Sequence, residues 1–288
     1  MMMSRPRWLP HPGWLLLLPA VALLGGILGV PLWQSFWRSI GSGDWTLEHY
    51  SALFTDGVTL KVLARTGQAA AVVTIVTLLL GYPYAYLMTR VGPLWRSVLV
   101  VMVLMPFWTS ALARNFGWLI LLYDNGLVQR FIALFGFKDV VLYGTAQGVT
   151  LAMSQVLLPF MVLPLFSALG GIDRKLLLAA RSLGSPPLVA FWKVYFPLSR
   201  GGVVAGIILT FTLACGFYVT PALIGSPRES LIAQLLGQRT TQLLDFAGAG
   251  ALGTLVLVVT LVLVWWANRM GGSMATIGVV AGQAGTRR

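Results

Sequence analysis

Long apolar stretches alternate with short polar segments along the whole chain. Each stretch can cross the hydrocarbon core of a bilayer, which takes about 20 residues of helix. The six stretches cover residues 14–37, 66–88, 97–123, 143–172, 201–225 and 246–268. The pattern predicts an all-α polytopic membrane protein with six transmembrane helices. No linker or repeat divides it, so we expect one transmembrane domain over 14–268, between tails at 1–13 and 269–288.

Arg114 interrupts the third apolar stretch. Arg96 and Arg114 lie about 27 Å apart along an α-helix, at about 1.5 Å per residue. That distance lets the two arginines sit at opposite interfaces of one helix, because long basic side chains are favoured at both membrane surfaces. We therefore expect residues 97–123 to form a single span.

The composition agrees with this class of protein. The chain is 57% hydrophobic and 10% charged, and its mean hydropathy is +0.83, far from the values of soluble domains. The first stretch contains Ala20-Val21-Ala22, which resembles a signal-peptidase site, but the apolar run continues to Trp37, so we interpret it as an uncleaved span. The lone cysteine, Cys215, allows no intrachain disulfide.

The charges predict the orientation. The N-tail, the loops after the second and fourth spans, and the C-tail carry twelve basic residues and one acid, Asp173, whereas the other side carries eight basic residues and seven acids. Basic residues accumulate on the cytoplasmic side of membrane proteins, so both termini are expected in the cytoplasm. The net charge of +12 is explained by this asymmetry, and no nucleic acid partner is expected.

One loop on the predicted outer side carries a helical pattern. Leu127, Phe131 and Phe135 recur at every fourth position within residues 126–137. This spacing predicts a short helix that lies on the membrane surface or covers a cavity.

The loop at 173–200, on the predicted cytoplasmic side, has unusually consistent local signals. Asp173 can cap a helix over 174–183, and Gly184 can end that helix in the left-handed conformation. Ser185 can cap a second helix that has Pro186 at its first position. That helix would carry four apolar groups outside the bilayer, where a protein partner or the headgroup region must cover them. They are Leu188, Phe191, Trp192 and Tyr195.

At this loop the chain resembles the permease family of binding-protein-dependent ABC importers. The family's cytoplasmic motif is Glu-Ala-Ala, three residues, Gly, nine residues, Ile, one residue, Leu-Pro. Leu178-Ala179-Ala180, Gly184, Val194 and Phe196-Pro197 stand here at the same spacing, with Leu178 in place of the acid. Segments 105–122, 158–173 and 218–227 resemble the spermidine/putrescine-type permeases, although relatives that move ferric ion, thiamine or aminophosphonates share parts of them.

The resemblance implies the ABC importer type I permease fold, in a bacterial inner membrane, with the loop as the coupling element that docks on a cytoplasmic ATPase. The docking residues would be Ala179, Ala180, Gly184, Ser185, Leu188, Phe191, Trp192 and Pro197. It also implies a second permease subunit, expected to be a paralogue, two ATPase subunits and an external solute-binding protein. The chain has no G-x-x-x-x-G-K-[ST] motif, so ATP and Mg²⁺ are expected on the ATPase, with no cofactor, metal or catalytic residue here.

A polyamine is a flexible chain of ammonium groups, which aromatic rings and carboxylates bind well. The candidate pathway residues are Trp108, Tyr123, Asp124, Phe160, Tyr218, Glu229 and Asp245. The aromatic residues also suit helix packing or interfacial anchoring. Arg114 would repel a cation unless Asp124 or another acid neutralises it.

Two other classes compete with a permease. An ion-coupled secondary transporter usually holds an acid near the midplane, and here every acid falls in a loop or at a span edge, although Gln155 and Asn115 remain possible ligands. An intramembrane enzyme needs a catalytic constellation, but His11 and His49 fall on opposite sides of the predicted membrane.

Overall fold

The computed structural model describes residues 18–40, 48–124, 126–136 and 140–284. The predicted N-tail, the start of the first span at Trp14, and the last residues of the C-tail lie outside these ranges. Within them, all regular elements are helices, apart from an isolated β-bridge between Gly144 and Gly225. The contacts divide the chain into two compact units: one holds the residues up to Asp56 with Gln238–Leu257, the other Gly57–Gly237 with the residues from Val258.

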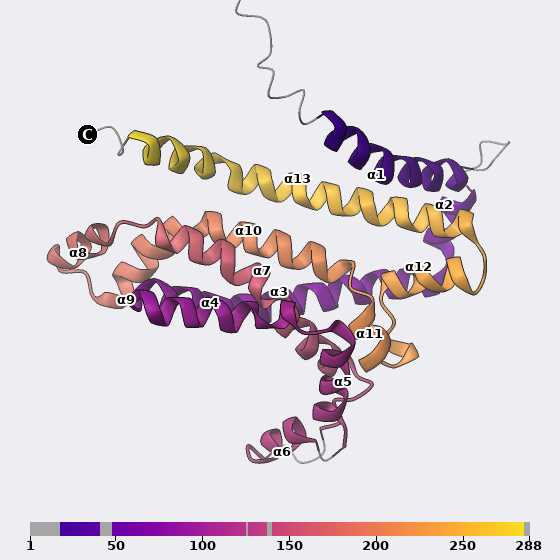
Figure 1. Cartoon of the computed structure of the whole chain (residues 1–288), viewed down its shortest axis with the longest axis horizontal. Helices are drawn as coiled ribbons and strands as arrows, with labels where there is room; N and C mark the ends of the chain where they lie inside the picture. The colour runs from indigo at the N-terminus through magenta and orange to yellow at the C-terminus, as the bar shows by residue number, and fades with distance from the viewer. Residues whose placement is uncertain (1–17, 41–47, 125, 137–139, 285–288) are drawn as a thin grey trace, which may run out of the picture. The chain divides into compact units, whose positions relative to one another are not determined.

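The membrane-spanning helices confirm the predicted class. In the part of the chain that the structure describes, five helical segments are long and apolar enough to cross a bilayer, or six if one bent pair counts as a span. The five are Leu18–Ser39, Gly57–Arg90, Ala146–Gly170, Pro187–Cys215 and Phe246–Trp265. In Figure 1 they are α1 (Leu18–Ser39), α3 (Gly57–Arg90), α7 (Ala146–Gly170), α9 with η2 and α10 (Pro187–Ala190, Phe191–Tyr195, Phe196–Cys215), and the first part of α13 (Phe246–Ala284).

The third span is broken, so the prediction of one continuous helix is wrong. It consists of α4 (Pro93–Trp108) and α5 (Ala111–Leu122), and the chain bends by 99° between α4 and the segment that begins at Ala111. Thr109 and Ser110 are extended at the break, where the carbonyl groups at the end of α4 lose their helical partners. The Pro106 carbonyl instead accepts hydrogen bonds from the Thr109 hydroxyl (3.0 Å) and the Arg114 guanidinium. Arg114 therefore stabilises the bend.

The second unit is built around α3, α7 and α10, and each of these helices contacts the other two (Figure 1). Glycine allows α7 and α10 to approach closely, as small residues commonly do in membranes. A Cβ atom on Gly206 would lie 2.6 Å from the Met161 Sδ, and one on Gly202 would lie 2.5 Å from the Ala168 Cβ. The buried hydroxyls of Thr74 and Thr77 donate to carbonyl groups one turn earlier, which satisfies them without a partner helix.

Two short helices follow the bend in the same unit. The predicted helix in the outer loop is present as α6 (Leu127–Ala133), and the side chains of Leu127, Phe131 and Phe135 are exposed. The Phe131 and Phe135 rings pack edge to face, 5.3 Å apart. After α10, the short helices α11 (Val219–Ile224) and η3 (Pro227–Glu229) lead to α12 (Ile232–Thr241), so the predicted span at 201–225 actually begins earlier and ends at Cys215.

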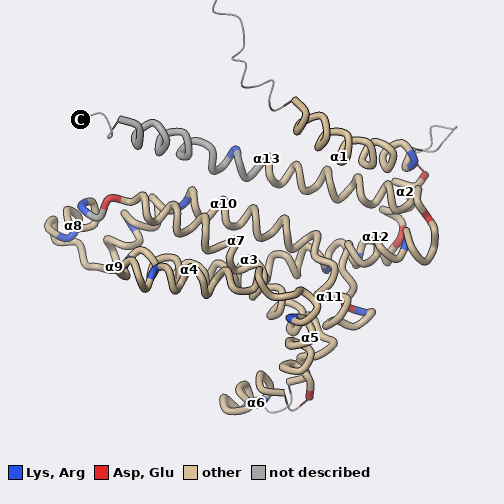
Figure 2. Tube along the Cα trace, viewed as in Figure 1, with Lys and Arg blue, Asp and Glu red and all other residues tan. Residues whose placement is uncertain are grey.

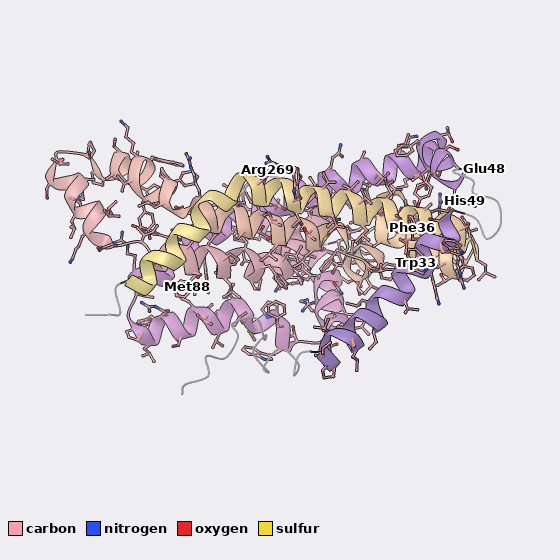
Figure 3. All side chains as sticks on the ribbon, turned by 90° about the horizontal axis from the view of Figure 1, so that it is seen from above. Trp33, Phe36, Glu48, His49, Met88 and Arg269 are labelled. Atoms are coloured by element: carbon pink, nitrogen blue, oxygen red, sulfur yellow. The ribbon has the colours of Figure 1, made fainter. Side chains whose placement is uncertain are left out.

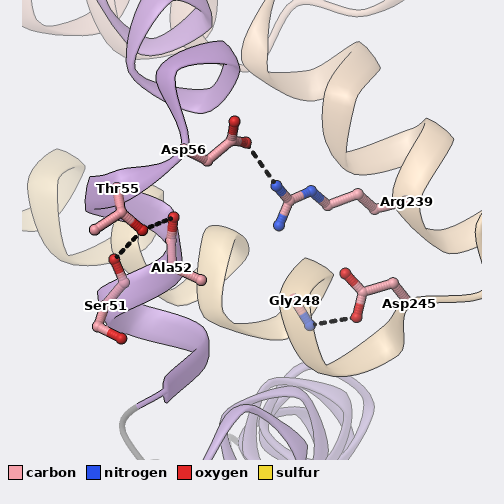
Figure 4. A network of polar contacts seen from close by, with 7 residues as sticks. All are labelled: Ser51, Ala52, Thr55, Asp56, Arg239, Asp245 and Gly248. Atoms are coloured by element: carbon pink, nitrogen blue, oxygen red, sulfur yellow. Dashed lines mark hydrogen bonds and ion pairs between the residues drawn. The ribbon is translucent and has the colours of Figure 1, made fainter.

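The first unit contains α1, α2 (Glu48–Thr55), the end of α12 and the start of α13. Trp33 and Trp37 stack near the end of α1, 6.0 Å apart, and Glu48 and His49 begin α2 (Figure 3). Figure 4 shows the polar contacts of this unit, in which the Asp56 carboxylate pairs with the Arg239 guanidinium at 3.4 Å. Asp245 caps the start of α13 by accepting a hydrogen bond from the Gly248 N–H at 2.8 Å.

Candidate functional site

The loop between α7 and α10 begins with α8 (Arg174–Ser182), an amphipathic helix capped as the sequence predicts. The Asp173 carboxylate accepts a hydrogen bond from the Lys175 N–H at 2.9 Å. Gly184 ends the helix with φ +84°, the left-handed conformation. Two hydrogen bonds close the corner: Gly184 N–H donates to the Arg181 carbonyl (3.0 Å) and Ser185 N–H to the Ala180 carbonyl (3.1 Å). This pair of bonds is a Schellman motif, which fixes the direction of the chain as it leaves α8.

The second helix differs from the prediction. Ser185 does not cap it: Pro186 occupies the cap position and Pro187 the first helical position. The helix is not separate either, because α9 continues through the π-helical turn η2 into α10. Phe196 N–H donates to the Phe191 carbonyl, the i to i−5 bond that defines such a turn. The loop is therefore joined rigidly to α10.

The predicted aromatic face divides into two surfaces. Leu188 and Trp192 are 71% and 56% exposed, as a docking surface requires. Ala179 of α8, another residue of the predicted docking set, is also exposed. Tyr195 is only 5% exposed, and Phe191, Ala180 and Pro197 are half-buried. The Phe191 ring lies edge to face with the Tyr82 and Tyr86 rings of α3, 6.0 Å from each. Phe191 and Tyr195 thus face the bundle and not the outside.

Tyr82 and Tyr86 are functional candidates that the sequence reasoning missed. Ser199 donates its hydroxyl hydrogen to the Phe196 carbonyl (2.8 Å), so the Tyr82 hydroxyl donates to Ser199 Oγ at 2.9 Å. Together these contacts connect α3 directly to η2 and the first turn of α10. The available signal was the spacing of two tyrosines four residues apart, near the basic end of an apolar helix.

Two of the predicted pathway residues share a cavity. Tyr123 and Asp124 line a space of about 620 Å³ between α5 and α6, together with Tyr143 and Arg130. The Tyr123 and Tyr143 rings are 5.7 Å apart and tilted by 49°. The cavity combines two aromatic rings and the exposed Asp124 carboxylate, which suit an ammonium group, with the Arg130 guanidinium, which repels one.

The other predicted pathway residues do not join this cavity. Phe160 is half-buried and packs edge to face on Phe107 at 5.3 Å, whereas Trp108 and Tyr218 are exposed. Glu229 is 3.9 Å from the Arg65 guanidinium, and Asp245 belongs to the other unit, where it caps α13.

The polar residues considered for a secondary transporter have partners within the protein. Asn115 is buried, accepts from the Thr220 hydroxyl at 2.9 Å and donates to the Ala111 carbonyl. Gln155 accepts a hydrogen bond from the Trp118 indole at 2.6 Å. Across the described residues, no group of three or more His, Cys, Asp or Glu side chains is arranged to hold a metal.

Basic residues gather around α8, α9 and the adjoining ends of α4 and α10 (Figure 2).

The fold is similar to that of a bacterial alginate ABC transporter, which was crystallised with an alginate pentasaccharide-bound periplasmic protein. The TM-score is 0.70, the match covers 91% of this chain and 94% of that chain, and the sequence identity is 18%. This similarity shows that the two proteins share a fold, a bundle of membrane-spanning helices.

Residues 78–272 match the family described as binding-protein-dependent transport system inner membrane component. The chain belongs to this family and is a multi-pass inner membrane permease. The spermidine/putrescine transport system permease protein PotB of Escherichia coli K12 is 31% identical over 266 residues, which cover 90% of this chain and 95% of PotB. PotB of Haemophilus influenzae is also 31% identical, over 78% of this chain and 80% of its own.

Proposed function

We propose that this chain is the subunit through which a polyamine of the spermidine and putrescine type enters the cytoplasm, driven by ATP hydrolysis on separate chains. The observation that carries the proposal is the similarity to PotB over 90% of the chain, which includes the whole coupling loop. The cavity lined by Tyr123, Tyr143, Asp124 and Arg130 supports it, because two rings and a carboxylate suit an ammonium group and the carboxylate opposes the charge of the arginine.

In this proposal the coupling loop is the contact with the ATPase subunits, which carry ATP and Mg²⁺. Leu183, Leu188 and Trp192 are exposed around the Gly184 corner. Exposed apolar groups at the end of a bundle favour a protein partner that covers them. A second permease subunit, a paralogue, completes the pathway, and an external solute-binding protein delivers the substrate.

Both termini lie in the cytoplasm in this proposal. The support is the concentration of basic residues around α8 and the adjoining helix ends, since the rule for basic residues places that end inside. The cavity at Asp124 then lies toward the external side, where the substrate arrives.

The test is reconstitution of this chain in proteoliposomes with its second permease, ATPase and binding protein. Labelled spermidine should accumulate only with ATP, and unlabelled putrescine should compete whereas thiamine, ferric ion or an aminophosphonate should not. The chain alone should neither hydrolyse ATP nor accumulate spermidine. Competition by one of the other solutes, or ATP hydrolysis by the chain alone, would contradict the proposal.

A further inference from the structure

A second, smaller cavity lies at the opposite end of the bundle from Asp124. It has a volume of about 130 Å³ and is lined by Arg90, Arg96, Thr89, Phe166, Leu177 and Tyr195, among others. Three helix ends meet here: α3 ends at Arg90, α4 begins at Pro93 and α7 ends at Gly170. Because all three belong to membrane spans, the cavity lies at the boundary between hydrocarbon and water.

Neutral groups hold both arginines of this cavity in place. The Arg90 guanidinium donates to the Tyr86 hydroxyl at 2.6 Å and lies 4.8 Å from the centroid of that ring. The Arg96 Nε–H donates to the Met88 carbonyl at 3.2 Å, and its guanidinium lies 6.0 Å from the Phe166 centroid. Two fixed cations therefore share one small space.

No acid of the described residues forms an ion pair with either arginine. Among all the described residues, the ion pairs are Arg65–Glu229 and Arg239–Asp56. The nearest acid in sequence on this side, Asp173, caps α8. Because guanidinium groups bind phosphate and carboxylate with several donors, the cavity is suited to an anion from outside the chain.

The surroundings indicate which anion. Leu94 and Trp95, at the start of α4 between the two arginines in sequence, are 75% and 66% exposed. Tryptophan is enriched at the level of the lipid headgroups, and basic pockets between helices on the cytoplasmic side bind anionic headgroups. The exposed indole and leucine lie between the two arginines in sequence, so an acyl chain and a phosphate of one lipid can be bound by neighbouring parts of the chain.

We propose that Arg90 and Arg96 bind the phosphodiester of an anionic phospholipid. Leu177 of α8 and Tyr195 of η2 line the same cavity, so the bound headgroup contacts the coupling loop as well as α3 and α4. The lipid then holds the loop against the bundle. This site is independent of the transported substrate.

The experiment measures lipid retention by the purified full-length protein with native mass spectrometry, in mixtures of phosphatidylglycerol and phosphatidylcholine. The wild type should retain phosphatidylglycerol preferentially. Each arginine near a surface contributes about fivefold to the binding of an anionic lipid, so Arg90→Gln with Arg96→Gln should weaken the preference about 25-fold. Arg200→Gln is the matched control, because Arg200 is exposed on α10 near the same end but does not line the cavity.

Three outcomes would overturn the proposal. An unchanged preference in the double variant excludes the site. Displacement of the lipid by millimolar inorganic phosphate assigns the cavity to a free anion. If the double variant no longer copurifies with the ATPase but keeps its lipid preference, the cavity binds a carboxylate of the ATPase. If the double variant does not fold, a photoreactive phosphatidylglycerol on the wild type decides: cross-links should map beside the cavity, and cross-links elsewhere contradict it.

Discussion

Tyr195 packs edge to face against Tyr86, with ring centroids 5.4 Å apart and planes at 89°. One ring comes from the turn that follows the coupling helices and the other from α3, which lies early in the chain. This contact means that a displacement of the loop reaches α3 directly as well as through α10.

Substitution of Gly184 tests the corner of the loop. Valine is poorly accommodated at φ +84° and should cost about 1 kcal/mol or more, whereas asparagine tolerates this region. A Cβ atom there has nothing within 4 Å, so conformation and not space decides the outcome. Gly184→Val should remain in the membrane but lose substrate uptake, while Gly184→Asn keeps most of it. Uptake and ATPase activity are measured together, and equal uptake by the two variants would show that the corner is unimportant.

Removal of a tyrosine ring tests the contact between α3 and the loop. Tyr86→Ala deletes edge-to-face contacts with Phe191 and Tyr195, each worth about 0.5–1.5 kcal/mol beyond the buried area. We expect a lower thermal midpoint and less substrate moved per ATP hydrolysed. Tyr86→Phe keeps the ring and serves as the control. Normal stoichiometry in Tyr86→Ala would mean that α10 alone carries the motion.

The bend in the third span depends on Arg114. Its guanidinium donates to the Pro106 carbonyl, and hydrogen bonds from charged groups contribute about 1.5–3 kcal/mol. Arg114→Leu should therefore lower the thermal midpoint of the protein in detergent. Arg200→Gln, which removes an exposed cation, should not. An unchanged thermal midpoint in Arg114→Leu would show that the hydrogen bond from the Thr109 hydroxyl to the Pro106 carbonyl is sufficient to stabilise the bend.

The close approach of α7 and α10 predicts opposite results for adjacent glycines. Gly202→Ala places a methyl group 2.5 Å from the Ala168 Cβ and 2.8 Å from the Pro164 carbonyl oxygen. Overpacking of this kind costs about 1–3 kcal/mol, so expression or thermal stability should fall. Gly201→Ala meets nothing within 4 Å and should behave like the wild type. Equal stability of the two variants would contradict the helix packing.

The three acids predicted to lie on the outer side should differ in their effect on uptake. Glu229 is near Arg65 and Asp245 caps α13, whereas Asp124 is exposed in the cavity with two tyrosines. Asp124→Asn should slow uptake more at low ionic strength than at 0.1 M salt, where charges are screened over about 10 Å. Glu229→Gln should change the salt dependence less. Initial uptake rates at two ionic strengths check this. Identical salt dependence in the wild type, Asp124→Asn and Glu229→Gln would exclude electrostatic attraction by Asp124.

Local signals predicted the coupling loop well, because a cap and a glycine corner involve only neighbouring residues. Asp173 and Gly184 have the predicted roles. Ser185 does not, since the second of two consecutive prolines begins the helix and moves the cap to Pro186. The burial of Phe191 and Tyr195 depends on α3, which no local pattern of the loop encodes.

The break in the third span was hidden by its continuous hydrophobicity. Pro106 and the pair Thr109-Ser110 were the available signals, but proline is common in membrane helices and often only bends them. The partners of the predicted pathway acids could not be predicted from the sequence either, because the pairing of Glu229 with Arg65 brings together distant parts of the chain.

The direction in which the loop leaves α10 depends on the number of residues in the π-helical turn at Phe191–Tyr195. An α-helix rotates by roughly 100° per residue, so deletion of one residue here would turn the preceding segment about the α10 axis by that angle. Leu188 would point in a new direction even though no side chain of the bundle had changed. If the loop contacts an ATPase as proposed, insertions and deletions in this one turn should disrupt that contact more than substitutions of the exposed residues themselves.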